Sequence, residues 1–197
     1  MTQIVLFHSV LGVRPGVHAA ADLLRSHGHD VRIVDQYGGR VFDDYDEASA
    51  FAEWLGFPAL MAGAVEGVAD LKDDLVVMGF SNGGGMAQFV ATQRTGVRAA
   101  VLLSGAIDLA VLGGAAWPQG VPAQVHYTVD DPFRLEEWVR AAVDAVAAAG
   151  GAVEQWDYPG SGHLFTDQSR PMEYQQVEAS LLWSRVLPFI EEVDRAV

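Results

Sequence analysis

The stretch DLVVMGFSNGGGMAQ, residues 74–88, is an apolar run that stops at Ser81, turns through three glycines and continues as a predicted helix. It contains the pattern G-x-S-x-G, in which Gly79 and Gly83 flank the serine. A strand that passes directly into a helix through this pattern turns so sharply that small neighbours are needed beside the serine. The turn exposes the hydroxyl above the sheet and points a helix N-terminus at it. The stretch therefore predicts a strand–turn–helix unit with Ser81 at its apex.

The motif by itself leaves the function open. With 21 glycines among 197 residues and the serines that the chain contains, G-x-S-x-G is expected about 0.1 times by chance. Such a turn presents a nucleophilic serine in some proteins, but a glycine-rich turn between strand and helix also binds phosphate or simply allows close packing. The rest of the chain has to decide between these functions.

The same alternation of strand and helix extends over the whole chain. Short β-branched runs predict strands at 4–8, 31–34, 75–80, 100–104, 123–128 and 153–157. Segments with helical period predict helices at 15–27, 59–71, 85–95 and 134–149, and a last helix at 174–195 that is interrupted or kinked at Pro188. The acidic segment 42–54 and the Gly/Pro-rich segment 111–122 are expected to be irregular and at the surface. This alternation predicts a mostly parallel sheet with helices on both faces.

Length and composition limit the possible classes of protein. A chain of 197 residues, 50% hydrophobic and 19% charged, suits a single domain over residues 1–197 with no large cap domain. The formal net charge of −14 opposes binding to nucleic acid and to anionic membranes. The chain contains no cysteine, which excludes disulfides, thiolate metal sites and a cysteine nucleophile. The N-terminal MTQIVLFHSV does not resemble a signal peptide, and no apolar stretch is long enough to span a membrane, so we expect a cytoplasmic protein, monomeric or homodimeric.

Candidate catalytic residues gather at the predicted carboxyl ends of the strands, where ligands bind in sheets of this kind. A serine hydroxyl is a weak nucleophile, so it needs a base, and the base needs an orienting group. His163, in the loop YPGSGHLF after the last strand, is the predicted base. The segment HYTVDDPF places Asp130 and Asp131 after the fifth strand, one to orient His163 and the other to start a turn or cap a helix. Asp108, after the fourth strand, is the third choice.

The other histidines are less suited to catalysis. His18 lies in a predicted helix, His27 and His29 flank the end of that helix, and His126 lies inside a strand. Each of these is expected to be a surface or core residue. His8 ends the first strand, so it is the one of this group that is placed to line the site.

Several motifs together resemble one family. The chain order Ser, Asp, His is that of the α/β-hydrolases. The segments LFHSVLGVRPG, GFSNGG, HYTVDDPF and YPGSGHLFTD look like those of the dienelactone hydrolase family, a compact branch of that superfamily, and the likeness runs from residue 4 to residue 195. The resemblance implies a compact α/β-hydrolase fold and a triad of Ser81, Asp131 and His163. Asp130 stays open as the alternative acid, because the alignment can slip by one residue.

Three positions depart from the family pattern. The best-known nucleophile of the family is cysteine, whereas this chain has Ser81, which implies chemistry closer to that of a serine esterase. Ser9 stands where these hydrolases carry a glutamate that interacts with the cysteine. Asp167 stands where they carry an arginine that holds the substrate's carboxylate, and we expect it to repel such a carboxylate. Dienelactone is therefore not the expected substrate.

The expected reaction is hydrolysis of a small neutral ester or lactone through an acyl-enzyme, with neither a cofactor nor a metal. The backbone N–H groups of Val10 and Asn82 are expected to bind the oxyanion, and Leu11 is the neighbouring alternative to Val10. The candidate pocket walls are Tyr37, Phe80, Trp117 and Phe165, each beside a strand-end loop.

Three other functions remain as alternatives. A thioesterase or deacetylase would use the same triad. A non-catalytic binding module would keep the scaffold without the chemistry, although candidates for all three triad positions argue against it. A nucleotide- or phosphate-binding domain would use GFSNGGG as an anion site, but the chain is strongly acidic and its glycine turn matches neither G-x-x-x-x-G-K-[ST] nor G-x-G-x-x-G.

Overall fold

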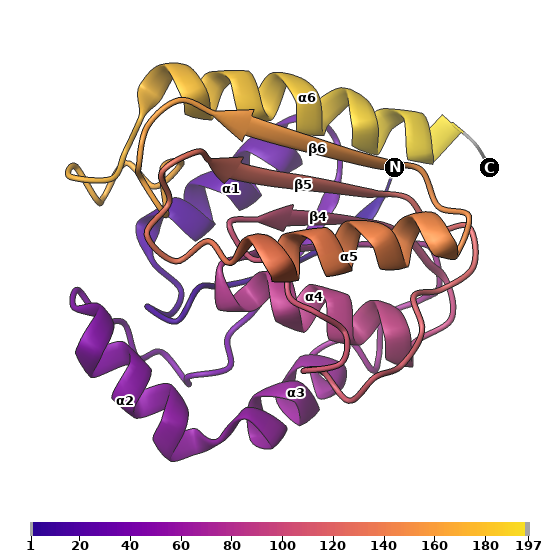
Figure 1. The fold of residues 1–197 in the computed structure, drawn as a ribbon, viewed down its shortest axis with the longest axis horizontal. Helices are drawn as coiled ribbons and strands as arrows, with labels where there is room; N and C mark the ends of the chain where they lie inside the picture. The colour runs from indigo at the N-terminus through magenta and orange to yellow at the C-terminus, as the bar shows by residue number, and fades with distance from the viewer. Residues whose placement is uncertain (1, 196–197) are drawn as a thin grey trace.

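A computed structural model describes residues 2–195, which form a parallel sheet covered by helices on both faces (Figure 1). The strands are β1 (Gln3–Phe7), β2 (Asp30–Val34), β3 (Leu75–Phe80), β4 (Val97–Leu103), β5 (Ala123–Thr128) and β6 (Val153–Tyr158). Their order in the sheet is β2-β1-β3-β4-β5-β6, and every neighbouring pair is parallel. The predicted fold class is confirmed, and the carboxyl ends of all six strands meet at one edge of the sheet.

Helices cover the two faces unequally. They are α1 (Pro15–Ser26), α2 (Tyr45–Leu55), α3 (Phe57–Glu66), α4 (Asn82–Gln93), α5 (Glu136–Ala148) and α6 (Gln176–Arg195). One core contains Leu24 of α1 and Leu182 of α6, and lies on one face of the sheet (Figure 1). The other core lies under α3, α4 and α5 and contains Val90 and Val139. Every residue of β3 is buried, since this strand lies inside the sheet with helices on both sides.

The acidic segment 42–54 was expected to be irregular, and this prediction is wrong, because the segment carries α2. The Asp44 carboxylate accepts the backbone N–H groups of Asp46 at 2.9 Å and Glu47 at 3.0 Å, which caps the helix N-terminus. The acidic residues in the first turn also interact favourably with the helix dipole. The charges that favoured a loop in the sequence therefore begin a helix. The segment 111–122 contains no helix or strand, as predicted.

All five predicted helices differ from their predicted bounds by one or more residues, and the helix predicted at 85–95 begins at Asn82. The helix expected at 59–71 begins at Phe57, with Pro58 in its first turn, and ends at Glu66. The last helix runs without interruption through Pro188. Pro188 is exposed, and because proline has no N–H group it cannot donate to the Ser184 carbonyl four residues earlier.

The pair α2 and α3 extends outward from the sheet: α3 packs against α4, whereas α2 lies farther from the sheet (Figure 1). Gly56 joins them with a positive φ of 81°, and the two helix axes are bent by 81°. Within residues 2–195, no single helix is long and apolar enough to cross a membrane, and this bent pair meets the criterion only when its two helices are joined. Only Ala48 of α2 is fully enclosed, so most of this helix remains on the outside of the molecule.

Candidate active site

Ser81 lies at the apex of the turn between β3 and α4, with the unusual backbone angles φ 53° and ψ −121°. A positive φ is strained for a residue with a side chain, and it persists only where the surroundings hold it. Here the Ser81 N–H donates to the Leu103 carbonyl at 2.7 Å, and the Ser81 carbonyl accepts the Gly84 N–H at 2.8 Å. These bonds fix the turn and present the hydroxyl at the edge of the sheet.

The two glycines of G-x-S-x-G are required by close backbone contacts. A Cβ atom on Gly79 would lie 1.9 Å from the Gly83 carbonyl oxygen. A Cβ atom on Gly83 would lie 2.3 Å from the Phe7 carbonyl oxygen at the end of β1. The pattern therefore reflects how tightly α4 approaches β1 and β3, as the sequence predicts.

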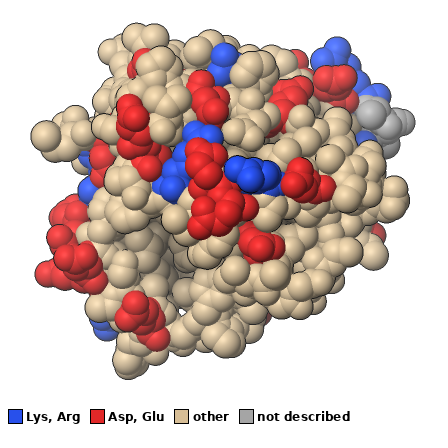
Figure 2. All heavy atoms as spheres, viewed as in Figure 1, with Lys and Arg blue, Asp and Glu red and all other residues tan. Residues whose placement is uncertain are grey.

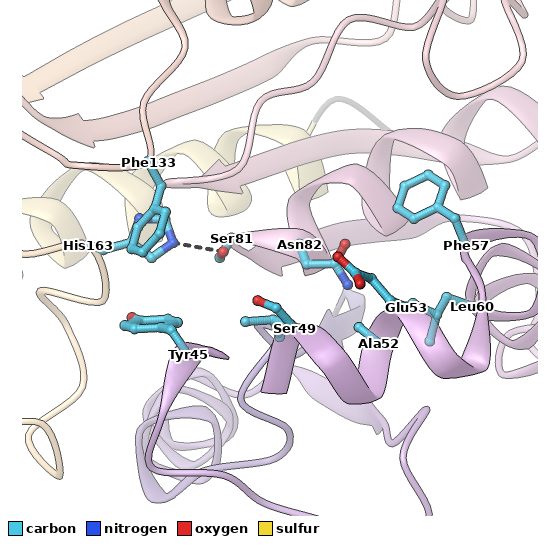
Figure 3. A pocket seen from close by; sticks show the side chains of 11 residues that line it. Tyr45, Ser49, Ala52, Glu53, Phe57, Leu60, Ser81, Asn82, Phe133 and His163 are labelled. Carbon is cyan, nitrogen blue, oxygen red and sulfur yellow. Dashed lines mark hydrogen bonds between the residues drawn. The ribbon is translucent and has the colours of Figure 1, made fainter. Parts of the chain in front are cut away.

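His163 connects Ser81 to Asp131 through hydrogen bonds. Its Nε2 lies 2.7 Å from the Ser81 hydroxyl oxygen (dashed line in Figure 3), and its Nδ1 lies 2.9 and 2.8 Å from the two Asp131 oxygens. A carboxylate only accepts, so Nδ1 carries the proton in the neutral ring and Nε2 is free to accept from the serine hydroxyl. His163 and Asp131 are buried, with 4% and 7% of their surfaces exposed. Asp130 is exposed, and its N–H donates to the Gly160 carbonyl at 3.0 Å.

Two aromatic rings and one carboxylate hold the His163 loop. The ring centroids of Tyr45 and Phe133 lie 6.0 and 4.7 Å from that of His163. The Glu173 carboxylate accepts the Tyr45 hydroxyl at 2.9 Å and the Leu164 N–H at 2.8 Å. Burial, together with the neighbouring Glu173 charge, raises the pKa of Tyr45 far above its ordinary value, so the hydroxyl stays protonated and donates. The base is thus fixed both by its own loop and by the first turn of α2.

Ser81 opens into a cavity with two lobes. The first, which we call the α2 lobe, has a volume of about 490 Å³ and includes Tyr45, Glu53 and Leu60 in its walls. The second, the β4 lobe, has a volume of about 480 Å³ and includes Ile107 and Trp138. The residues that line both lobes are Ser49, Phe57, Ser81, Asn82, Phe133 and His163. The shared residues place the serine and the histidine where the two lobes meet.

The two residues whose backbone N–H groups are expected to bind the oxyanion both line the α2 lobe. Asn82 is the first residue of α4, so its N–H has no partner within the helix. Val10 follows β1 and lines the α2 lobe together with Asn82 and Ser81. The Leu11 N–H donates to the Ser9 hydroxyl oxygen at 3.2 Å, and Leu11 is fully buried, so this neighbour is unavailable to a ligand. The geometry favours Val10 over Leu11 as the second N–H donor to an oxyanion.

The four aromatic residues expected as pocket walls line neither lobe, which corrects that prediction. Tyr37 and Trp117 are 5% exposed and pack in the core under α3, α4 and α5. Phe80 and Phe165 pack in the core under α1 and α6. Position beside a strand end was the reason for choosing them, but each side chain turns toward a face of the sheet and away from its edge.

The cavity is lined instead by residues that the sequence analysis did not select. The larger aromatic and apolar wall residues include Tyr45, Phe57, Leu60, Ile107, Tyr127, Phe133, Leu135 and Trp138. Tyr45 and Phe57 belong to α2 and α3. A helix-capping aspartate at position 44, followed by apolar residues at helical spacing, was a signal in the sequence that could have predicted α2.

Asp167 lines neither lobe, so the expected repulsion of a substrate carboxylate by this residue is not supported. Its carboxylate is buried, accepts the N–H and O–H of Ser169 at 2.9 and 2.7 Å, and lies 3.4 Å from the Arg14 guanidinium. Asp167 therefore joins its loop to the start of α1. Ser9 is also buried, and its hydroxyl accepts the Leu11 N–H. Asp108 accepts the Ala110 N–H at 2.9 Å and starts a local turn.

Two histidines at strand positions have structural contacts. His8 is fully buried, bonds through Nδ1 to the Ser9 carbonyl at 2.6 Å, and accepts the Gln36 N–H at 3.1 Å. His126 is fully buried between the Tyr158 hydroxyl at 2.8 Å and the Gln124 side-chain oxygen at 3.1 Å. Burial lowers the pKa of His8, and it lowers the pKa of His126 to about 3. Neither lines a lobe of the cavity, so His8 does not take the place that its sequence position suggested.

Comparisons with known proteins bear on the family and the fold of this chain. The model of the dienelactone hydrolase family matches residues 1–194. No curated protein matches the sequence.

Among solved structures, a dienelactone hydrolase-like promiscuous phosphotriesterase from metagenomic libraries has a TM-score of 0.80 at 16% identity, covering 98% of this chain and 87% of its own. A thermophilic esterase from Thermogutta terrifontis, with propionate bound, has a TM-score of 0.65 at 15% identity, covering 95% and 83%. A dienelactone hydrolase from Anabaena variabilis has a TM-score of 0.60 at 21% identity, covering 92% and 83%. At these identities the likeness to the solved structures establishes the fold.

Proposed function

The chain belongs to the dienelactone hydrolase family and is a hydrolase that acts on ester bonds, and from this premise we propose that it cleaves a small ester or lactone through an acyl-enzyme on Ser81. The observation that carries the proposal is the position of His163, with Nε2 2.7 Å from the Ser81 hydroxyl and Nδ1 bonded to Asp131. A serine hydroxyl with this partner is a nucleophile whose proton has an acceptor.

In the first half of the proposed reaction, the Ser81 oxygen attacks the ester carbonyl carbon while its proton moves to His163 Nε2. The Asp131 carboxylate stabilises the resulting imidazolium. The carbonyl oxygen becomes an oxyanion, which accepts hydrogen bonds from the N–H groups of Val10 and Asn82. The bond from carbon to the alcohol oxygen then breaks, and the alcohol leaves with the proton from His163. The acyl group stays on Ser81.

In the second half, a water molecule attacks the acyl carbon and gives a proton to His163. The oxyanion forms again at the same two N–H groups and collapses with release of the carboxylic acid. The proton returns to the Ser81 oxygen, which restores the free enzyme. The cavity leaves room for the water because Ser81 is partly exposed where the two lobes meet.

A fluorophosphonate probe tests this proposal directly, because it reacts with activated serine hydroxyls. We expect the label on the peptide that contains Ser81, no label in Ser81→Ala, and strongly slowed labelling in His163→Ala. Ser180→Ala is the matched control, because Ser180 is an exposed serine of α6 that lines neither lobe. Hydrolysis of p-nitrophenyl acetate and butyrate is measured on the same proteins. A folded wild-type protein that neither labels nor hydrolyses these esters is a non-catalytic binding module.

The same machinery also cleaves thioesters. Parallel kinetics with an oxygen ester and a thioester of the same acyl group separate these activities. We expect the oxygen ester to have the higher kcat/KM, and the reverse order identifies a thioesterase.

A further inference from the structure

Glu53 gives the α2 lobe a negative charge that nothing in the lobe balances. Glu53 lies on α2 and lines this lobe together with Phe57 and Leu60. Of the described residues that line the two lobes, none is lysine or arginine, and Glu53 is the one acidic residue. The charge of the cavity therefore differs from that of a site built to hold a carboxylate.

The Glu53 carboxylate has no partner among the residues that the structure describes. Within residues 2–195, neither an ion pair nor a hydrogen bond engages this side chain, and Glu53 is exposed. Its neighbour along the helix, Trp54, stacks on Phe51, and Arg40 lies over the Phe51 ring at 5.0 Å. Glu53 is therefore available to a charged group of a ligand that enters the cavity.

The surroundings of Glu53 suit an organic cation. Figure 3 shows Glu53 across the cavity from His163, on the same side as Phe57. Phe57, on the side of Glu53, and Tyr45, beside His163, place aromatic rings in the same lobe, and aromatic faces attract ammonium groups. In Figure 2, acidic side chains also gather over α2, at the left of the view. These charges lower the potential around the entrance to the lobe.

The β4 lobe has the opposite character. Ile107, Leu135 and Trp138 line it, and none of the described residues in its walls is aspartate, glutamate, lysine or arginine. This lobe suits a hydrocarbon chain, while the α2 lobe suits a positively charged group. Ser81 lies between them, where an ester bond that joins the two parts would be placed.

We propose that the enzyme selects esters with an amino or ammonium group, bound beside Glu53 in the α2 lobe, and an apolar chain in the β4 lobe. This inference rests on the proposed function of Ser81. Glu53 is a specificity-determining residue and takes no part in bond making or breaking. Esters that carry a carboxylate are disfavoured by the same charge.

Three esters of one acid test the charge selectivity. Butyrylcholine carries a trimethylammonium group, 3,3-dimethylbutyl butyrate is its neutral isostere, and 3-carboxypropyl butyrate carries a negative charge. In wild type at low ionic strength we expect kcat/KM to be about tenfold higher for the cation than for the isostere, and lowest for the anion. The preference should weaken with added salt, because an exposed charge is screened.

Two variants of α2 separate the effect of Glu53 from that of net charge. Glu53→Gln should bring the ratio of cationic to neutral kcat/KM close to one. Glu47→Gln removes one charge from the same helix at an exposed residue that lines neither lobe, and should keep most of the preference.

The outcomes separate this inference from the proposed function. Hydrolysis of the neutral ester that depends on Ser81 but shows no preference for the cation overturns the charge selectivity alone. A preference that persists in Glu53→Gln also overturns it. Failure of all three esters, together with absence of the fluorophosphonate label, overturns the proposed function and this inference with it.

Discussion

Replacing Asp131 by asparagine should lower kcat for ester hydrolysis by about 10⁴-fold, equivalent to about 5 kcal/mol in the barrier, while the fold is kept. An asparagine has the same shape, and its oxygen can still accept the Phe133 N–H, which is 2.9 Å from the carboxylate in the native protein. Its NH₂ group would then face His163 Nδ1, which lies 2.8 Å from the second carboxylate oxygen.

This exchange reverses the proton positions on the histidine ring. The amide donates to Nδ1, so the ring proton moves to Nε2, 2.7 Å from the Ser81 hydroxyl oxygen. A protonated Nε2 cannot accept the serine proton, so the base is lost although all heavy atoms remain in place. The positive charge that forms on the ring also loses its carboxylate partner.

The assay is the initial rate of p-nitrophenyl butyrate hydrolysis at saturating substrate, with thermal unfolding of each variant measured in parallel. Asp130→Asn is the matched control, because Asp130 is exposed and lies next in the chain. We expect this control to retain kcat within about twofold, as is usual for surface positions away from special contacts. The reasoning is refuted if Asp131→Asn keeps more than a tenth of the wild-type kcat, or if Asp130→Asn is the variant that loses it.

Three further predictions concern stability and the support of the site. His126 has a pKa lowered to about 3 from 6.5, so between these pH values the unfolded chain binds a proton that the folded chain does not. The free energy of unfolding should therefore fall by about 1.4 kcal/mol per pH unit as the pH drops through this window. Urea unfolding at several pH values measures this slope, and His126→Gln should flatten it. In Gly105→Ala the new Cβ would lie 2.0 Å from the Ser81 carbonyl oxygen. Calorimetry should therefore show a free energy of unfolding lower by about 1 to 3 kcal/mol, and kinetics should show a lower kcat. An unchanged stability and kcat would contradict the tight contact. Glu173→Ala removes the acceptor of the Leu164 N–H from the loop that carries His163 and should lower kcat about tenfold. Glu173→Gln keeps one acceptor oxygen and should recover part of the rate. Equal rates for the two variants would exclude a role of this hydrogen bond in holding the His163 loop.

The sequence by itself determined the sheet and the turn that presents Ser81. Hydrophobic period reports which face of the sheet a side chain meets, and the close approach of α4 to β1 and β3 leaves a direct mark as the glycines at 79 and 83. The predicted strands at 75–80 and 123–128 coincide with β3 and β5, in which every residue is buried. Among the histidines, the position of His163 in the loop YPGSGHLF after the last strand selected it as the predicted base.

Only the tertiary structure decided which neighbouring residue meets the site. Asp130 and Asp131 are the same residue type and adjacent in the chain. The direction of each side chain depends on how the loop after β5 packs against the loop after β6. Val10 and Leu11 differ in the same way, because the Ser9 hydroxyl occupies one N–H group.

The walls of the cavity, and the place of Glu53 in them, were also decided by the tertiary structure. Ser81 and His163 are 82 residues apart in the chain, and their 2.7 Å contact depends on the order and register of the strands between them. The period of a segment records the surface that it buries, whereas a cavity is lined by what several segments leave unburied. That information is shared among distant parts of the chain, so no single stretch of sequence contains it.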